Sequence, residues 1–95
     1  NNACSSATTM VPGGTYAGTT VNATTDGLSS CPASTAARTR PDVWYAFTAP
    51  SAGTLQVDTC LSSPADTVVS IHTSCPGNAS TQIACNDDAG NNGPC

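Results

Sequence analysis

Six cysteines are the residues best suited to chemistry in this chain of 95 residues. They are widely scattered, at Cys4, Cys31, Cys60, Cys75, Cys85 and Cys95. Neither a C-x-x-C motif nor a pair of histidines accompanies them, so their spacing does not fit a structural zinc site. An even number of cysteines in a small chain is typical of disulfide bonds, which form in oxidising compartments. The cysteines therefore predict a secreted protein that is held together by disulfides.

The order of the cysteines suggests one set of three disulfides. We expect Cys4–Cys31 to fasten the N-terminal segment and Cys75–Cys85 to span a hairpin loop. These two bonds leave Cys60–Cys95 as the third. Other pairings stay open, because six cysteines can be joined in many ways. A Cys95 that is unpaired within the chain would be able to link two subunits.

Three aspartates form the best candidate for a metal site: Asp66, Asp87 and Asp88. If residues 67–73 and 82–85 form a hairpin, all three fall at the same end of it. Carboxylates that converge there, with Asn86 nearby, supply the hard oxygen ligands that calcium prefers. We therefore predict a calcium site. In the alternative, Asp66 and Asp87 cap turns through backbone hydrogen bonds.

Catalytic residues are scarce. A Ser-His-Asp site would need His72, the single histidine, which alternates with Ser70 on a predicted strand. None of the serines is surrounded by a G-x-S-x-G elbow. Paired acids for glycoside hydrolysis must face each other across a cleft, whereas Asp87 and Asp88 are sequence neighbours. We predict that the protein is not an enzyme.

Two sequons offer sites of modification. Asn22-Ala23-Thr24 and Asn78-Ala79-Ser80 match the N-glycosylation pattern, and each lies in or near a predicted turn. We predict Asn22 and Asn78 as candidate glycosylation sites. Serine and threonine are abundant, so O-glycosylation is the alternative.

The charge pattern narrows the classes of partner. The net charge is −4, and the cations are two arginines, Arg38 and Arg40. An acidic surface without a basic patch repels nucleic acid, so we exclude DNA and RNA as partners. No segment approaches the ~20 apolar residues of a membrane span. The chain starts at Asn1 without a charged and apolar leader, and we expect that an export signal has been removed.

Alternation of apolar and polar residues at period two predicts the elements that position these groups. The expected strands are residues 42–48, 54–60, 67–73 and 82–85, with an edge strand at residues 15–21. Aromatic residues on both faces of 42–48 place this strand in the core and leave Tyr16 as the aromatic able to stack on a sugar. We predict one domain over residues 1–95, an all-β, antiparallel jelly-roll-like β-sandwich that is small and disulfide-stapled.

Several motifs together resemble a known family. They are Asn1-Asn2-Ala3-Cys4, Gly14-x-Tyr16-x-Gly18, Asp42-Val43-Trp44-Tyr45-x-Phe47-Thr48-Ala49-Pro50, Gly53-Thr54-Leu55-x-Val57-x-Thr59-Cys60, Asp66-Thr67-Val68-Val69-Ser70-Ile71 and Ile83-Ala84-Cys85-Asn86-Asp87-Asp88. This set is similar to the bacterial pre-peptidase C-terminal domain family, and the match covers nearly the whole chain. The resemblance implies a jelly-roll sandwich without catalysis of its own. It also implies an appended module of secreted proteins, of which some attach to insoluble polymers and some bind calcium.

The chain departs from that family at its C-terminal end. Family members continue with further strands after the Asn86-Asp87-Asp88 loop, whereas this chain stops at Cys95. A sandwich that lacks its closing strands exposes backbone donors and acceptors along an edge, and an extended segment can pair there. Two explanations stay open. Either the chain is truncated, or another chain supplies the strands and head-to-tail repetition builds a filament.

These observations predict a non-catalytic extracellular module with a structural or adhesive role at the surface of a bacterium. Its partners would be copies of itself, assembled by edge-strand contacts into a surface fibre, or neighbouring domains of a larger surface protein. The alternative is an accessory module that targets a secreted protease or glycosidase to a polysaccharide or protein polymer.

Overall fold

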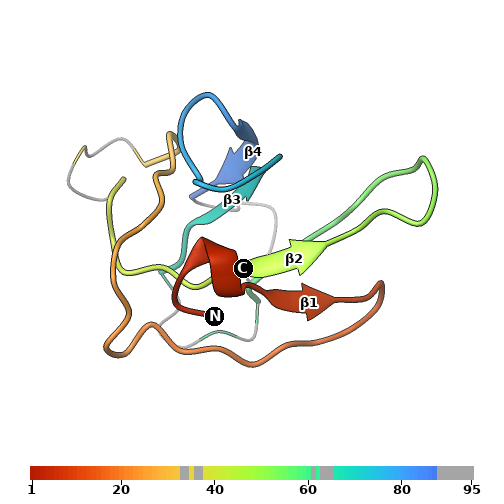
Figure 1. The fold of residues 1–95 in the computed structure, drawn as a ribbon, viewed down its shortest axis with the longest axis horizontal. Helices are drawn as coiled ribbons and strands as arrows, with labels where there is room; N and C mark the ends of the chain where they lie inside the picture. Colours follow the sequence, from red (N-terminus) through yellow and green to blue (C-terminus); the bar gives the residue numbers. More distant parts are fainter. Residues whose placement is uncertain (33–34, 36–37, 61, 63–65, 88–95) are drawn as a thin grey trace.

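Two small sheets form the regular structure in residues 1–32, 35, 38–60, 62 and 66–87, the parts of the chain that this computed structural model describes. In one sheet β1 (Thr8–Met10) pairs with β2 (Tyr45–Phe47), and in the other β3 (Val69–His72) pairs with β4 (Gln82–Asn86). A short 3-10 turn, η1 (Cys4–Ser6), precedes β1. Figure 1 shows that long irregular connections join these elements. The predicted all-β class is confirmed.

The first sheet is parallel, so the prediction of antiparallel strands is wrong for this sheet. Thr8 lies opposite Tyr45, and Met10 lies opposite Phe47. The chain before β1 extends this contact, because the backbone N–H of Trp44 donates to the carbonyl of Asn1 at 2.8 Å. A strand of three residues is too short to show alternation, so β1 gave no signal. The predicted edge strand at residues 15–21 is not a strand in the structure.

The second sheet is the predicted hairpin. β3 and β4 are antiparallel, with Val69 opposite Asn86 and Ser70 opposite Cys85. The register shifts between Ile71 and His72, where the ladder has a bulge. β-branched Val69 and Ile71 favour a strand here, since branching at Cβ suits the pleated backbone.

Two predicted strands are shorter than expected or absent. The segment 42–48 contributes β2 alone, and residues 54–60 form no strand. Alternation of apolar and polar residues indicates which face of a segment can be buried. A strand also needs hydrogen bonds to the backbone of a neighbouring segment. No hydrogen bond joins the backbone of residues 49–57 to another described residue.

Two disulfides tie the N-terminal third of the chain to the β3–β4 hairpin. They are Cys4–Cys75 and Cys31–Cys85, with Cα–Cα distances of 5.9 and 5.8 Å. The predicted Cys4–Cys31 and Cys75–Cys85 bonds are therefore wrong. Cys60 is also disulfide-bonded. Its predicted partner, Cys95, lies outside the described residues, so that bond stays a prediction.

The hairpin register explains why a local Cys75–Cys85 bond does not form. Cys85 lies opposite Ser70, well along the strands, whereas Cys75 lies in the turn beyond His72. The two cysteines are at opposite ends of the hairpin. Each cysteine instead forms a disulfide with the N-terminal third of the chain. Near Cys85, the backbone N–H of Ser30 donates to the side-chain oxygen of Gln82 at 2.9 Å.

Burial is shallow throughout the described part of the chain. No aliphatic or aromatic side chain there is fully buried, although Pro32 is. Val11, Val21 and Ile83 are 63%, 75% and 68% exposed. So thin a core leaves little hydrophobic stabilisation, which gives the disulfides a large share of the stability. Among the described residues no helix has the length and hydropathy needed to cross a membrane.

Candidate binding surface

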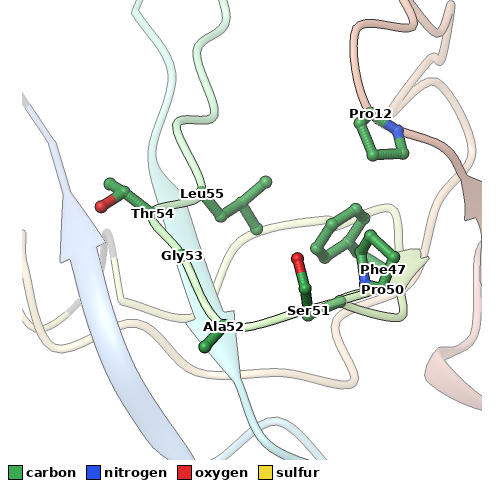
Figure 2. A pocket seen from close by; sticks show the side chains of 9 residues that line it. Pro12, Phe47, Pro50, Ser51, Ala52, Gly53, Thr54 and Leu55 are labelled. Carbon is green, nitrogen blue, oxygen red and sulfur yellow. The ribbon is translucent and has the colours of Figure 1, made fainter.

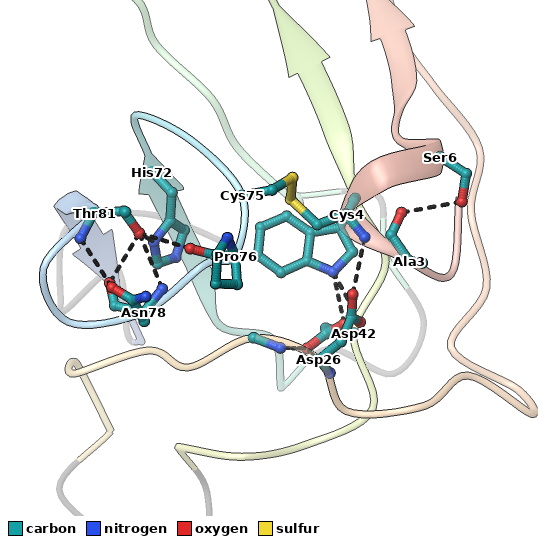
Figure 3. The surroundings of a disulfide bond; sticks show 12 residues. Ala3, Cys4, Ser6, Asp26, Asp42, His72, Cys75, Pro76, Asn78 and Thr81 are labelled. Carbon is teal, nitrogen blue, oxygen red and sulfur yellow. Dashed lines mark hydrogen bonds between the residues drawn. A yellow bond between two sulfur atoms is a disulfide. The ribbon is translucent and has the colours of Figure 1, made fainter.

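The indole of Trp44 joins Asp42, the 26–28 segment and the β3–β4 turn at Gly77. Figure 3 shows Asp26 and Asp42 near Cys4, which forms a disulfide with Cys75. Its Nε1 donates to Asp42 Oδ1 at 2.8 Å and to Asp26 Oδ1 at 3.2 Å. The six-membered ring lies directly against Gly27 and Gly77, where a Cβ would overlap the ring atoms. Glycine at both positions lets the 26–28 segment and the β3–β4 turn close on this side chain.

Asp26 and Asp42 share one hydrogen-bonded network around the indole. Asp26 Oδ2 accepts from the backbone N–H of Cys4 at 2.9 Å, and Asp42 Oδ2 accepts from that of Gly27 at 2.9 Å. The Cys4 hydrogen bond and the contact with Asp42 lower the pKa of Asp26. Burial and the contact with Asp26 raise the pKa of Asp42. N–H donors occupy these oxygens, so the pair serves as a structural link.

His72 closes the base of the β3–β4 hairpin through both ring nitrogens. Nδ1 lies 3.2 Å from Thr81 Oγ1, and Nε2 lies 3.0 Å from Ser70 Oγ. Thr81 Oγ1 accepts a hydrogen bond from the backbone N–H of Asn78. The Thr81 hydroxyl can itself donate to the Pro76 carbonyl, which lies 3.0 Å away. With the Thr81 proton on the Pro76 carbonyl, Nδ1 donates to Thr81 and Nε2 accepts from Ser70. Burial lowers the pKa of His72, which favours this neutral form.

The Ser70–His72 contact resembles half of a hydrolase triad but differs at the third position. A carboxylate there would stabilise the imidazolium that forms when histidine takes the serine proton. Here the third partner is the neutral hydroxyl of Thr81, which is itself fixed by the turn. The three side chains act as a hydrogen-bonded brace across the hairpin.

The predicted calcium ligands are only partly described. The β3–β4 register brings Asp66 and Asp87 to the same end of the sheet, as expected, while Asp88 lies outside the described residues. Asp66 is exposed and Asp87 half-buried. Neither carboxylate accepts a hydrogen bond from a described residue, and the alternative turn-capping role stays open. The described residues contain no cluster of three metal-ligating side chains. The calcium site stays a prediction.

The two sequons differ in accessibility. Asn22 is exposed at a turn, with φ of 62°. Asn78 is half-buried, and its Oδ1 accepts from Ser80 Oγ at 2.7 Å and from Thr81 N–H at 3.2 Å. Modification of either asparagine stays a prediction.

Tyr16 is not the accessible stacking platform that the sequence suggested. It is half-buried, and its hydroxyl oxygen accepts from Val11 N–H at 2.8 Å. Its ring lies against Gly14 and has its centroid 6.3 Å from that of Tyr45. The ring therefore supports the loop after β1.

An open groove of about 210 Å³ lies at the end of β2 (Figure 2). Its apolar lining comes from Pro12 on one side and from Phe47, Pro50 and Leu55 on the other. The hydroxyl-bearing residues Ser51 and Thr54 add polar groups to the lining. Such a combination suits a ligand with both apolar faces and hydrogen-bonding groups.

Residues 49–58, which we call the arm, project from the end of β2 away from both sheets (Figure 1). The backbone of residues 49–57 makes no hydrogen bond with any other described residue. Leu55 and Val57 alternate with polar residues and are 42% and 39% exposed. The arm thus has the sequence pattern of a strand but no strand partner among the described residues.

Leu55 and Val57 stood out in the sequence, whereas the network around Trp44 did not. The spacing of Asp42 and Trp44, two residues apart, was a usable signal, because such residues lie on one face of an extended segment. Asp26 gave no local signal, since it comes from a distant loop.

Comparison with known families adds an independent finding. A family model described as Galactose binding domain-like, whose members are associated with the type IX secretion system, matches residues 1–92. The chain belongs to this family. No curated protein and no solved structure gives a significant match to the chain.

Membership of the galactose-binding-like family fixes the broad class of the protein. Such domains are typically non-catalytic binding modules, and the association with a secretion system implies a secreted or cell-surface protein. The match agrees with the predicted β-domain but does not single out the pre-peptidase C-terminal family.

Proposed function

We propose that this galactose-binding-like domain is a structural and adhesive module of a secreted protein, and that it attaches through the arm. The arm takes up an extended strand from a partner, which forms hydrogen bonds with the backbone of residues 51–57. The partner is a copy of the chain or a neighbouring domain of a larger surface protein.

The observation that carries this proposal is the unbonded, alternating arm. Its backbone is without hydrogen bonds to the described residues, and Leu55 and Val57 are exposed on it. A strand edge with exposed apolar residues pairs readily with another chain, and proteins use this mode for recognition. The resemblance to the pre-peptidase C-terminal family supports the same role, because it implies an appended, non-catalytic module.

Retention at the cell surface tests the proposal. In secreting cells, a Leu55→Ser/Val57→Ser chain is compared with the unaltered chain and with a Val21→Ser control. Val21 is 75% exposed and lies outside the arm. Its substitution therefore removes exposed apolar surface from the protein without changing the arm. We expect the arm variant to appear in the medium and the control to stay with the cells. Equal retention of both variants would contradict the proposal.

The groove supports a second candidate function, an accessory module that targets a secreted protease or glycosidase to a polymer. Phe47, Pro12 and Leu55 provide apolar surface, and Ser51 and Thr54 provide hydroxyl groups, as a polysaccharide ligand needs. Pull-down on insoluble polysaccharide separates the two candidates. Retention that is lost in Phe47→Ala but kept in Val57→Ser favours targeting through the groove, since Val57 does not line it.

We also propose calcium as a ligand of Asp66 and Asp87, with Asp88 as the third carboxylate. What supports it is that Asp66 and Asp87 lie at one end of the β3–β4 sheet and that their carboxylates accept no hydrogen bond from a described residue. Uncommitted carboxylate oxygens are the ligands that calcium requires.

A further inference from the structure

We propose that the strand partner of the arm is the arm of a second copy of this chain, paired antiparallel with Gln56 opposite Gln56 of the second copy. This inference rests on the proposed docking role of the arm and names its partner. The two copies would be related by a two-fold axis through that central pair.

The sequence of the arm is self-complementary about Gln56. Thr54-Leu55-Gln56-Val57-Asp58 reads polar, apolar, polar, apolar, polar in both directions. In an antiparallel pair centred on Gln56, each Leu55 lies opposite Val57 of the other copy, and each Thr54 lies opposite Asp58. An interface with a two-fold axis requires such a self-complementary patch.

Charge favours this register over a parallel one. Asp58 is the single charged residue of the arm. Parallel, in-register arms would bring two Asp58 carboxylates side by side, and like charges directly opposite are destabilising. The antiparallel register places the two Asp58 residues at opposite ends, each beside a Thr54 hydroxyl that can donate to it.

The apolar face of the pair would continue an existing surface. Leu55 lines the groove with Phe47 and Pro12, as Figure 2 shows. Val57 of the second copy would lie beside Leu55 and extend this apolar surface. Proline is absent from residues 51–58, so every residue there has a backbone N–H that can donate a hydrogen bond.

Two short strands bury less than the 1,200–2,000 Å² typical of stable protein complexes, so roughly micromolar or weaker pairing is expected. Cysteine cross-linking detects such weak but specific contacts. We expect Gln56→Cys chains to form disulfide-linked dimers under mild oxidation. Thr54→Cys and Asp58→Cys chains, each alone, should stay monomeric, because their new cysteines do not face each other. A mixture of these two variants should cross-link.

Peptide mapping first confirms that each variant keeps Cys4–Cys75 and Cys31–Cys85, which shows that it has folded. Equal cross-linking of all three variants alone would overturn the register, because random encounters produce that pattern. Monomers in every sample, together with release of the Leu55→Ser/Val57→Ser chain from cells, would overturn the second copy as partner and leave arm docking intact. Retention of that chain on cells would instead contradict the docking role.

Discussion

Trp44 Nε1 donates to the carboxylate of Asp42, two residues earlier, at 2.8 Å. This bond turns the indole toward Gly27 and Gly77, which cover the ring from separate segments. The 26–28 loop and the β3–β4 turn therefore meet at one side chain, and Asp26 links this point to the backbone of Cys4. In a protein whose described residues include no fully buried aliphatic or aromatic side chain, this meeting point takes the place of a core.

Adding a methyl group against Trp44 should destabilise the fold. We expect Gly27→Ala and Gly77→Ala each to lower the free energy of unfolding by about 1–3 kcal/mol, because overpacking forces neighbouring atoms to shift. Gly53→Ala is the matched control, since a Cβ there meets nothing within 4 Å. Denaturant titration measures all three. A control as unstable as the two Trp44-facing variants would contradict this account.

The aspartate pair should give stability a dependence on pH with two opposite parts. The folded pKa of Asp26 is lowered from 3.8, so its stabilising contribution is complete above pH 3.8 and is lost as the pH falls through the lowered value. The folded pKa of Asp42 is raised from 3.8, so its contribution is complete below pH 3.8 and is lost as the pH rises through the raised value.

Single substitutions separate these two parts. We measure denaturant midpoints across pH. Asp26→Asn should remove the loss of stability that occurs as the pH falls. Asp42→Asn should remove the loss of stability that occurs as the pH rises. Asp58→Asn, in the arm, serves as the control and should leave both pH-dependent losses of stability unchanged. If neither Asp26→Asn nor Asp42→Asn changed the pH profile, the network would not carry the proposed coupling.

Removal of either mapped disulfide should be costly. The bonds Cys4–Cys75 and Cys31–Cys85 span 71 and 54 residues. Chain-entropy arguments then predict a loss of about 4 kcal/mol for each, with the longer loop losing slightly more. The measurement is the unfolding free energy of Cys4→Ser/Cys75→Ser and Cys31→Ser/Cys85→Ser chains. Peptide mapping that joined Cys4 to Cys31 would contradict the structure directly.

Calcium should raise the melting temperature, because a ligand that binds only the folded state stabilises it. Asp66→Asn and Asp87→Asn should abolish the rise, whereas Asp58→Asn should preserve it. Melting curves with calcium and with a chelator provide the measurement. Identical melting temperatures in the two conditions would remove the calcium site.

The hairpin could be predicted from sequence because Val69, Ile71 and the residues of β4 carry both β-propensity and alternation. Alternation also marked residues 54–58 of the arm, which form no strand because no described backbone pairs with them. The disulfide pairing could not be predicted. It depends on which loops meet in space, and the contact of Cys4 with the turn at Cys75 is set by the packing around Trp44.

Hydrogen exchange across the arm tests the central claim most directly. Amide exchange of residues 51–57 is measured in chains attached to the cell surface and in isolated, dilute chains. If a partner strand docks on the arm, these amides exchange quickly in the isolated chain and are protected in the attached one, while β3 and β4 change little. Equally fast exchange in both states would show that the arm stays unpaired and would contradict the account.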